Sequence, residues 1–304
     1  MSQVWILDTD PGIDDALALF TLIGEGVELV GLTTVFGNAD VERTSRNALQ
    51  LLELAGHSAW VAKGASAPLH QAKHPPADFV HGVEGLGRVE LPAPHTQLIE
   101  QDAADAILSA SHQYAGRLVL APIGPLTNIA IALTRDPSLV ERVAEVVIMG
   151  GSLDAAGNVS DVAEANIWND PHAAQQVLRA GWPVKLVGLD VTSQIQLSLS
   201  AFSGLAAPAG PVLFQAADSY IQFYQSVGFA GCQLHDPAAV LAQLHPEWFR
   251  WERTGVDVVL EGDQAGRVIR DRAAPSIEVA MGVDIDALKH QFLTALAQGC
   301  QTRD

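Results

Sequence analysis

Residues 4–23 read VWILDTDPGIDDALALFTLI, and this stretch predicts the architecture of the chain. The apolar run at 4–7 predicts a buried strand, and the run at 16–23, after a polar turn, predicts a helix. The same alternation continues along the sequence. We expect further strands at 29–35, 118–121, 143–149 and 184–189, and helices at 41–55, 102–114, 126–133 and 171–180. Alternation at this spacing is typical of βαβ units with parallel strands.

The fold class expected from this pattern is α/β: a single domain over residues 1–304, built on a mainly parallel, doubly wound open sheet. The last third is less regular, with helices expected at 212–227, 237–244 and 284–298 and strands at 256–261, 267–270 and 277–281. Because ligands of such sheets bind beyond the carboxyl ends of the strands, residues that follow strands are the first candidates for a site.

Composition narrows the classes of protein. Hydrophobic residues make up 48% of the 304 residues, which is enough for a large core, and the two cysteines form no close pair that would suggest a zinc knuckle. The formal net charge of −18 disfavours a nucleic-acid partner, because an acidic surface repels phosphate. No apolar stretch reaches the ~20 residues of a membrane span, and the first residues do not resemble a signal peptide. We therefore expect a soluble cytoplasmic protein with no membrane partner.

Four aspartates lie within eight residues at the end of the first predicted strand: Asp8, Asp10, Asp14 and Asp15. Helix capping explains part of this pattern, with Asp10 as the N-cap before Pro11 and the later aspartates at the positive end of the helix dipole. Capping accounts for one or two carboxylates, whereas four raise one another's pKa unless a cation neutralises them. Oxygen ligands suit calcium or magnesium. We therefore favour a metal site whose further ligands come from distant segments.

The string DTDPGIDDALAL at 8–19 resembles the N-terminal signature of the inosine–uridine-preferring nucleoside hydrolases. Haloacid-dehalogenase-like phosphatases carry a looser DxD, but small hydroxyl or β-branched residues follow it there, whereas Pro11 and Gly12 follow here. Further segments match the family in order: VFGN at 35–38, HGVEGLG at 81–87, LVLAPIGPLTN at 118–128, VIMGG at 147–151, GN at 157–158, AEAN at 163–166 and CQLHDP at 232–237. Taken alone, each of these is also compatible with an ordinary turn, loop or helix cap.

The resemblance implies hydrolysis of the N-glycosidic bond of ribonucleosides to free ribose and nucleobase, by direct attack of a calcium-bound water on C1′ with inversion. It implies a nucleoside hydrolase-like fold and one Ca²⁺ per chain, held by Asp10, Asp15, Asp236 and the main-chain carbonyl of Ile123. In this scheme Asp10 is the general base and Asp8 supports the cluster from behind. His235 lies beside the departing base and, as a histidine that titrates near neutral pH, can offer it a proton.

The substrate-binding residues implied by the resemblance are Asp14, Asn38, His81, Met149, Asn158, Glu164 and Asn166. Asp14 and Asn38 would hold the 2′-hydroxyl, and His81 would lie near the base. Asn158, Glu164 and Asn166 would fix the 3′- and 5′-hydroxyls; the last two are two positions apart and so share one face of an extended chain.

The base side departs from the family pattern. Ala165 stands where an aromatic residue is common and Val227 where a tyrosine is common, so the preferred base is not predicted. The resemblance also implies a homodimer or homotetramer.

Two alternatives use the same aspartates. A magnesium-dependent phosphohydrolase would form an aspartyl-phosphate, but the sequence lacks a G-x-x-x-x-G-K-[ST] loop and has no Lys/Arg cluster near the motifs. A non-catalytic calcium-dependent sugar-binding module would explain the acidic cluster without needing His235. Release of ribose from inosine or uridine, measured with and without a chelator, separates the three interpretations.

Overall fold

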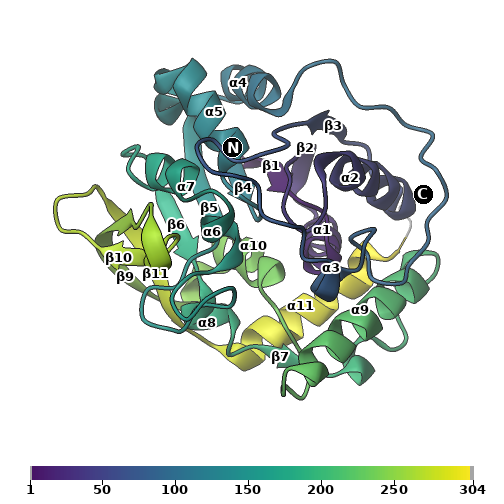
Figure 1. The fold of residues 1–304 in the computed structure, drawn as a ribbon. Coiled ribbons are helices and arrows are strands. Elements are labelled where there is room, and N and C mark those ends of the chain that lie inside the picture. The colour runs from purple at the N-terminus through teal and green to yellow at the C-terminus, as the bar shows by residue number, and fades with distance from the viewer. Residues whose placement is uncertain (1, 302–304) are drawn as a thin grey trace.

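A computed structural model describes residues 2–301 and shows one nine-stranded sheet at the centre of the molecule (Figure 1). The strands, in the order in which they pair, are β10 (Val268–Arg270), β9 (Phe249–Val258), β11 (Ser276–Val283), β6 (Val184–Val187), β5 (Val143–Met149), β4 (Leu118–Pro122), β1 (Val4–Thr9), β2 (Glu28–Thr34) and β3 (Trp60–Lys63). From β11 to β3 all neighbours are parallel, whereas β9 and β10 are antiparallel additions at one edge. The predicted fold class, a mainly parallel α/β sheet, is confirmed.

Strand β1 lies where the chain order reverses, because β2 pairs with it on one side and β4 on the other. Asp8 is in register with Thr33 of β2 and with Pro122 of β4. In an open parallel sheet the loops that leave such a reversal point diverge to opposite faces and open a crevice beyond the carboxyl ends of the strands. The acidic segment after β1 therefore lies where a ligand site is expected.

Helices cover both faces of the sheet. One face carries α1 (Ile13–Glu25), α2 (Val41–Ala55), α9 (Ala209–Ser226), α10 (Asp236–Leu244) and α11 (Ile285–Gly299), and the other carries α4 (Ala103–Gln113), α5 (Thr127–Arg135) and α7 (Pro171–Leu178). A hydrophobic core lies on each face of the sheet, and strand β1 contributes side chains to both. Trp5 and Leu7 pack on the first face and Ile6 packs on the second. The strands are thus buried on both sides, which explains their continuous apolar runs.

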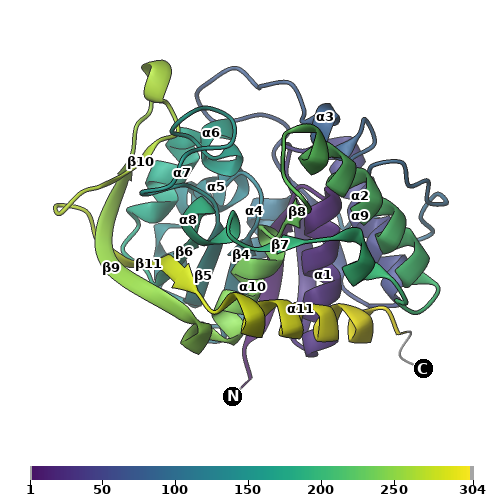
Figure 2. The ribbon, with the colours of Figure 1, turned by 90° about the horizontal axis from the view of Figure 1, so that it is seen from below.

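The last helix, α11, lies across α1 and α10 (Figure 2). Two glycines allow the close crossing of α11 with α1. A Cβ at Gly24 would lie 1.8 Å from the carbonyl oxygen of Ala295, and a Cβ at Gly299 would lie 2.0 Å from that of Phe20. Any side chain at either position would force the two helices apart.

Most predicted elements are found within one to four residues of their expected bounds, and 41–55 and 143–149 match α2 and β5. The strand predicted at 256–261 is displaced: β9 begins at Phe249 and ends at Val258. Its first half alternates polar and apolar residues because one side faces solvent, so it lacks the buried-strand pattern. Edge strand β3 and five short elements were not predicted, namely α3 (Asp78–His81), α6 (Ala165–Asn169), α8 (Leu189–Thr192), β7 (Gln196–Leu197) and β8 (Cys232–Gln233). Over residues 2–301, no helix has the length and apolar character to cross a membrane.

Candidate functional site

The centre of the candidate site is a buried group of carboxylates. Oxygens of Asp14 and Asp15, on the first turn of α1, and of Asp236, the first residue of α10, all lie within 4.8 Å of one another. Helices α1 and α10 pack together, so their N-terminal ends meet although they are far apart in sequence. Asp236 was predicted to lie close to the first acidic segment, and in the structure it lies beside Asp14 and Asp15.

Hydrogen bonds fix the turn that carries the cluster. Asp15 Oδ1 accepts from the Thr9 hydroxyl (2.5 Å) and the Asp10 amide (3.2 Å), and its Oδ2 accepts from the Gly12 amide (2.9 Å) and Asn38 Nδ2 (3.0 Å). The Asn38 amide in turn donates to Asp10 Oδ2 at 2.7 Å. Asn38, which follows β2, thus holds the side chains of both aspartates.

The electrostatics of the cluster favour a cation. Burial, reinforced by neighbouring aspartates, raises the pKa of Asp10 and of Asp236 well above the usual range. Burial also raises the pKa of Asp14 and of Asp15 to about 6. Three buried carboxylate oxygens, Asp8 Oδ2, Asp10 Oδ1 and Asp14 Oδ1, have no hydrogen-bond partner among the described residues. Uncompensated oxygens in a low-dielectric pocket are the donor set that a hard divalent ion binds.

Asp8 lies beneath this cluster and is held by residues of neighbouring elements. Its Oδ1 accepts from the Thr33 hydroxyl (2.6 Å) and from Asn128 Nδ2 (2.7 Å). Asn128 also donates to the Thr34 carbonyl (3.0 Å) and accepts from the Ala65 amide (2.8 Å). Burial raises the pKa of Asp8 to about 7. The supporting role expected for Asp8 stays a prediction, because its side-chain bonds go to Thr33 and Asn128. Asn128 is a structural partner that had no role in the sequence-based scheme.

Asn166 meets the ends of β4 and β5, and Glu164 meets the segment after β5. Asn166 Nδ2 donates to the Ile123 carbonyl (2.9 Å) and to the Met149 carbonyl (3.2 Å), which brings three predicted site residues together. Glu164 is the N-cap of α6: its carboxylate accepts from the amides of Asn166 (2.8 Å) and Gly151 (2.8 Å). The prediction that Glu164 and Asn166 share one face of an extended chain is therefore wrong. The two residues lie at the start of helix α6, where capping hydrogen bonds hold them.

Asn158 lies farther out, on the exposed loop between β5 and α6. Its Oδ1 accepts from the Ala165 amide at 3.0 Å, which ties the loop to the first residue of α6. Val227, at the end of α9, is 53% exposed.

The two predicted histidines lie on the opposite side of the carboxylates. His81, on α3, accepts from the Ile13 amide through Nδ1 (3.2 Å), and the same nitrogen lies 4.0 Å from Asp14 Oδ1. His235, next to Asp236, is held at both ring nitrogens: Nδ1 lies 2.8 Å from the Thr192 hydroxyl and Nε2 lies 2.8 Å from the Tyr224 hydroxyl. Burial lowers the pKa of both histidines to about 4. A histidine that titrates near neutral pH was expected at 235, whereas burial lowers its pKa and so favours the neutral imidazole.

Two tyrosines of α9 belong to the site and were missed. The Tyr220 hydroxyl donates to Asp14 Oδ2 at 3.2 Å, and the Tyr220 and Tyr224 rings are 5.0 Å apart in an edge-to-face contact. Their spacing of four residues places them on one face of the predicted helix at 212–227. That spacing was the available signal, but only the fold shows that this face meets Asp14 and His235.

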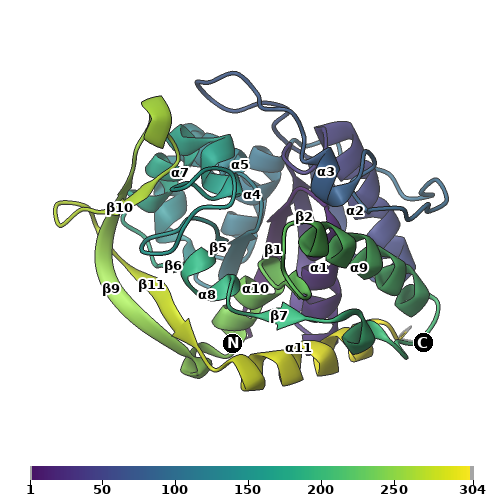
Figure 3. The ribbon, with the colours of Figure 1, turned by 60° about the horizontal axis from the view of Figure 1, so that its bottom comes forward.

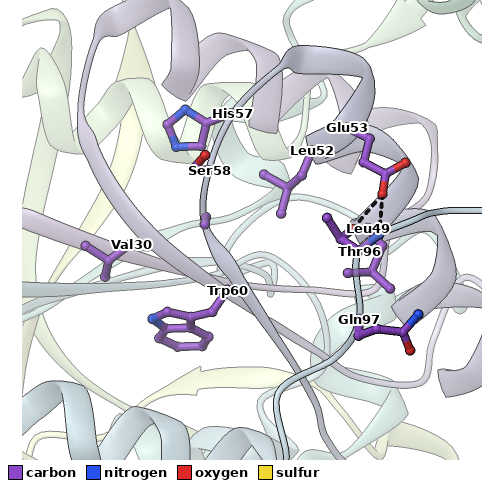
Figure 4. Close-up of a pocket in the computed structure, with 10 residues that line it drawn as sticks. Val30, Leu49, Leu52, Glu53, His57, Ser58, Trp60, Thr96 and Gln97 are labelled. Carbon is purple, nitrogen blue, oxygen red and sulfur yellow. Dashed lines mark hydrogen bonds between the residues drawn. The ribbon is translucent and has the colours of Figure 1, made fainter.

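A separate cavity of about 550 Å³ lies between α2 and the β3 edge (Figure 4). Its lining includes Leu49, Leu52 and Trp60, and Glu53 accepts from the amides of His95 (2.7 Å) and Thr96 (2.6 Å) at its rim. None of the predicted site residues lines it.

Comparison with known proteins identifies the family of this chain. The profile of the family described as inosine-uridine preferring nucleoside hydrolase matches residues 5–290. The chain is 40% identical to a probable uridine nucleosidase 1 of Oryza sativa subsp. japonica, over 88% of this chain and 84% of that one. It is 37% identical to the inosine-uridine preferring nucleoside hydrolase of Leishmania major, over 94% and 95% of the two chains.

A solved structure has the same fold. The purine-preferring ribonucleoside hydrolase from Gardnerella vaginalis superimposes with a TM-score of 0.94 at 35% identity, covering 98% of this chain and 99% of that one. With a family profile across nearly the whole sequence and relatives that match over most of their length, the chain belongs to the inosine-uridine preferring nucleoside hydrolase family.

Proposed function

We propose that this nucleoside hydrolase cleaves ribonucleosides to ribose and free base at the carboxylate cluster, with one calcium ion bound there. The observation that carries the proposal is the convergence of the Asp14, Asp15 and Asp236 carboxylates within 4.8 Å, beside an unpartnered oxygen of Asp10. Calcium accepts several carboxylate and carbonyl oxygens in flexible geometry, which suits a donor set of this size.

The ligands we propose are Asp10, Asp15, Asp236 and the carbonyl of Ile123. The Ile123 carbonyl faces the site, because Asn166 Nδ2 reaches it at 2.9 Å. Bound there, calcium would orient the ribose hydroxyls and lower the pKa of a water molecule.

Asp10 is proposed as the general base. Its Oδ2 is held by the Asn38 amide, while Oδ1 has no partner among the residues described and can accept a proton. A water oriented by Asp10 would attack C1′ from the face opposite the base, which inverts that carbon.

Recognition of the sugar is assigned to residues on two sides of the cluster. Asp14 and Asn38 come from the α1 and β2 side, and Glu164, Asn166 and Asn158 come from the loop and helix after β5. Their support is geometric: Asn38 bonds Asp15, and Asn166 bonds the carbonyls of Ile123 and Met149. Binding energy spent on the ribose positions the reacting carbon.

The base would leave toward His81 and His235. Because the pKa of His235 is low, we propose that it acts as a neutral hydrogen-bond donor or passes a proton together with Tyr224, whose hydroxyl lies at 2.8 Å. The named relatives act on uridine and on purine nucleosides, so the proposed substrates include both classes. The homo-oligomer expected from the resemblance remains a prediction, which light scattering in solution would test.

Release of free ribose from inosine and uridine, with calcium and with a chelator, tests the proposal. Activity that requires calcium supports it. Phosphate release from a nucleotide would favour the phosphohydrolase, and calcium-dependent ribose binding without bond cleavage would favour the sugar-binding module.

A further inference from the structure

Helix α8 is a single turn that follows β6 and packs against β11 and β6 (Figure 3). The Leu189 amide donates to the Gly151 carbonyl at 2.9 Å. A Cβ at Gly188 would lie 2.4 Å from the same carbonyl oxygen, so only glycine permits this approach. The turn is therefore fixed to the strand end from which the loop bearing Asn158 departs.

Asp190 of α8 holds the first part of that loop. Its Oδ2 accepts from the Leu153 amide (2.7 Å), and its Oδ1 accepts from the amides of Asp154 (2.7 Å) and Ala155 (2.9 Å). Three successive backbone N–H groups thus converge on one carboxylate, and hydrogen bonds to an ionised acceptor are stronger than neutral ones. Without Asp190 these three donors would have no side-chain acceptor in α8.

Arg270 of β10 contacts the same loop from the opposite side. Its guanidinium donates to both oxygens of Asp154 (2.6 and 2.9 Å) and to Glu252 (2.7 Å). The side chains of Arg270 and Asp154 are 38% and 57% exposed, and ion pairs so exposed contribute little. Asp190 is therefore the stronger of the two anchors.

Thr192, two residues after Asp190, supports the other side of the site. Its hydroxyl lies 2.8 Å from His235 Nδ1. Successive residues of a helix are rotated by about 100°, so side chains two positions apart point in nearly opposite directions. One helical turn thus reaches the sugar-side loop through Asp190 and the base-side imidazole through Thr192. Together the Thr192 and Tyr224 hydroxyls, one at each ring nitrogen, hold the orientation of the His235 ring.

We propose that α8 is a common support for the two halves of the site, with Asp190 positioning the Asn158 loop against the ribose and Thr192 positioning His235 against the leaving base. Neither residue touches the substrate; each acts through the group it holds. The inference rests on the proposed function, since it assumes that Asn158 contacts the sugar and that His235 assists the base.

Three substrates and three variants separate the two roles. The substrates are uridine, 5′-deoxyuridine and p-nitrophenyl riboside, whose phenolate leaves without help. In Asp190→Ala, the preference in kcat/KM for uridine over 5′-deoxyuridine should shrink by about tenfold, the value of one or two lost hydrogen bonds, while the preference for p-nitrophenyl riboside over uridine stays as in the wild type. In Thr192→Val, the preference for uridine over 5′-deoxyuridine should stay as in the wild type, while the preference for p-nitrophenyl riboside over uridine should grow. Thr192→Ser keeps the hydroxyl and should restore the wild-type ratios.

Ser193→Ala is the matched control, because Ser193 caps the same turn by donating to the Leu189 carbonyl but reaches no site residue. It should leave both ratios unchanged. Backbone amide exchange at 153–155 gives a readout independent of activity and should accelerate in Asp190→Ala only. If that variant does not fold, Asp190→Asn, which keeps one acceptor oxygen, replaces it.

Two outcomes would overturn the inference. One is an equal loss of kcat/KM on all three substrates in Asp190→Ala or Thr192→Val, and the other is unchanged amide exchange at 153–155 in Asp190→Ala. A wild-type enzyme that releases no ribose from uridine or inosine would instead refute the proposed function. A wild type that hydrolyses uridine and 5′-deoxyuridine equally well would leave that function standing and refute the sugar-side role of the loop.

Discussion

Removing calcium should destabilise the protein in a way that depends on pH. The pKa of Asp15 is raised from 3.8 to about 6, first by burial and then by the charge of Asp14. An acid whose pKa is higher in the folded state makes that state bind the proton more tightly than the unfolded state does. In the chelated protein, the free energy of unfolding therefore falls as pH rises from about 4 to about 6, and stays low at higher pH.

The size of the effect follows from the pKa of one carboxyl. A change from 3.8 to about 6 corresponds to about 3 kcal/mol for Asp15 above pH 6. For a chain of 304 residues, the entropy of unfolding is about 0.6 kcal/mol/K, so about 3 kcal/mol displaces the Tm by about 5 °C. The proposed calcium ion would neutralise the same charge. We expect the Tm with calcium to exceed the Tm with chelator by at least this amount at about pH 7.5, and the difference to narrow at about pH 5, where protons neutralise the carboxylates.

Thermal denaturation followed by circular dichroism, in calcium and in chelator at both pH values, measures these differences. Asp236→Asn should lose the response to calcium. Asp263→Asn, which alters an exposed aspartate far from the cluster in sequence, should retain it. A calcium effect that is absent at about pH 7.5, or equally large at both pH values, would refute the electrostatic reasoning. Elemental analysis of the untreated protein should find calcium, and zinc there would contradict the assignment of the ion.

Three further outcomes concern catalysis. Asp10→Asn should fold but lose activity by about 10²-fold or more, because it removes the proposed general base, and near-normal turnover would exclude that role. 2′-Deoxyuridine should react much more slowly than uridine, since it lacks the hydroxyl proposed to contact Asp14 and Asn38; equal kcat/KM values would contradict this. His235→Ala should slow inosine strongly and spare p-nitrophenyl riboside, whereas a parallel loss on both substrates would leave His235 a structural role only.

The sequence predicts elements well where one local signal dominates. Helix 41–55 is bounded by Asp40, which caps it by accepting from the Arg43 amide, and by Gly56 in the left-handed conformation, and both signals are local. Buried parallel strands such as β5 are equally distinct because both faces are apolar. The first half of strand β9 has one face towards solvent and so lacks the continuous apolar run. Helices α3, α6 and α8 are too short to show a helical period.

The residues of the site also differ in how far the sequence could predict them. Asp10, Asp14 and Asp15 are neighbours in sequence, so their convergence could be predicted, and the place of Asp236 came from family resemblance. Thr192 carried no local signal, and the spacing of Tyr220 and Tyr224 does not tell what their helix face contacts, because the contacts of Thr192 and Tyr224 with His235 are created only by the tertiary fold. The low pKa of His235 is also a property of burial, which no motif encodes.

The crossing of α11 over α1 also bears on how the chain folds as it is made. Helix α1 carries Asp14 and Asp15 and leaves the ribosome before α9, α10 and α11, which cover it and come from the last third of the sequence. Its apolar residues, such as Leu17 and Phe20, therefore stay partly uncovered until those helices have been made. Contacts between such distant segments slow folding and leave partly folded chains open to aggregation. The carboxylate cluster is complete only after Asp236 of α10 has been made, so the proposed metal ion could be captured only late in the synthesis of the chain.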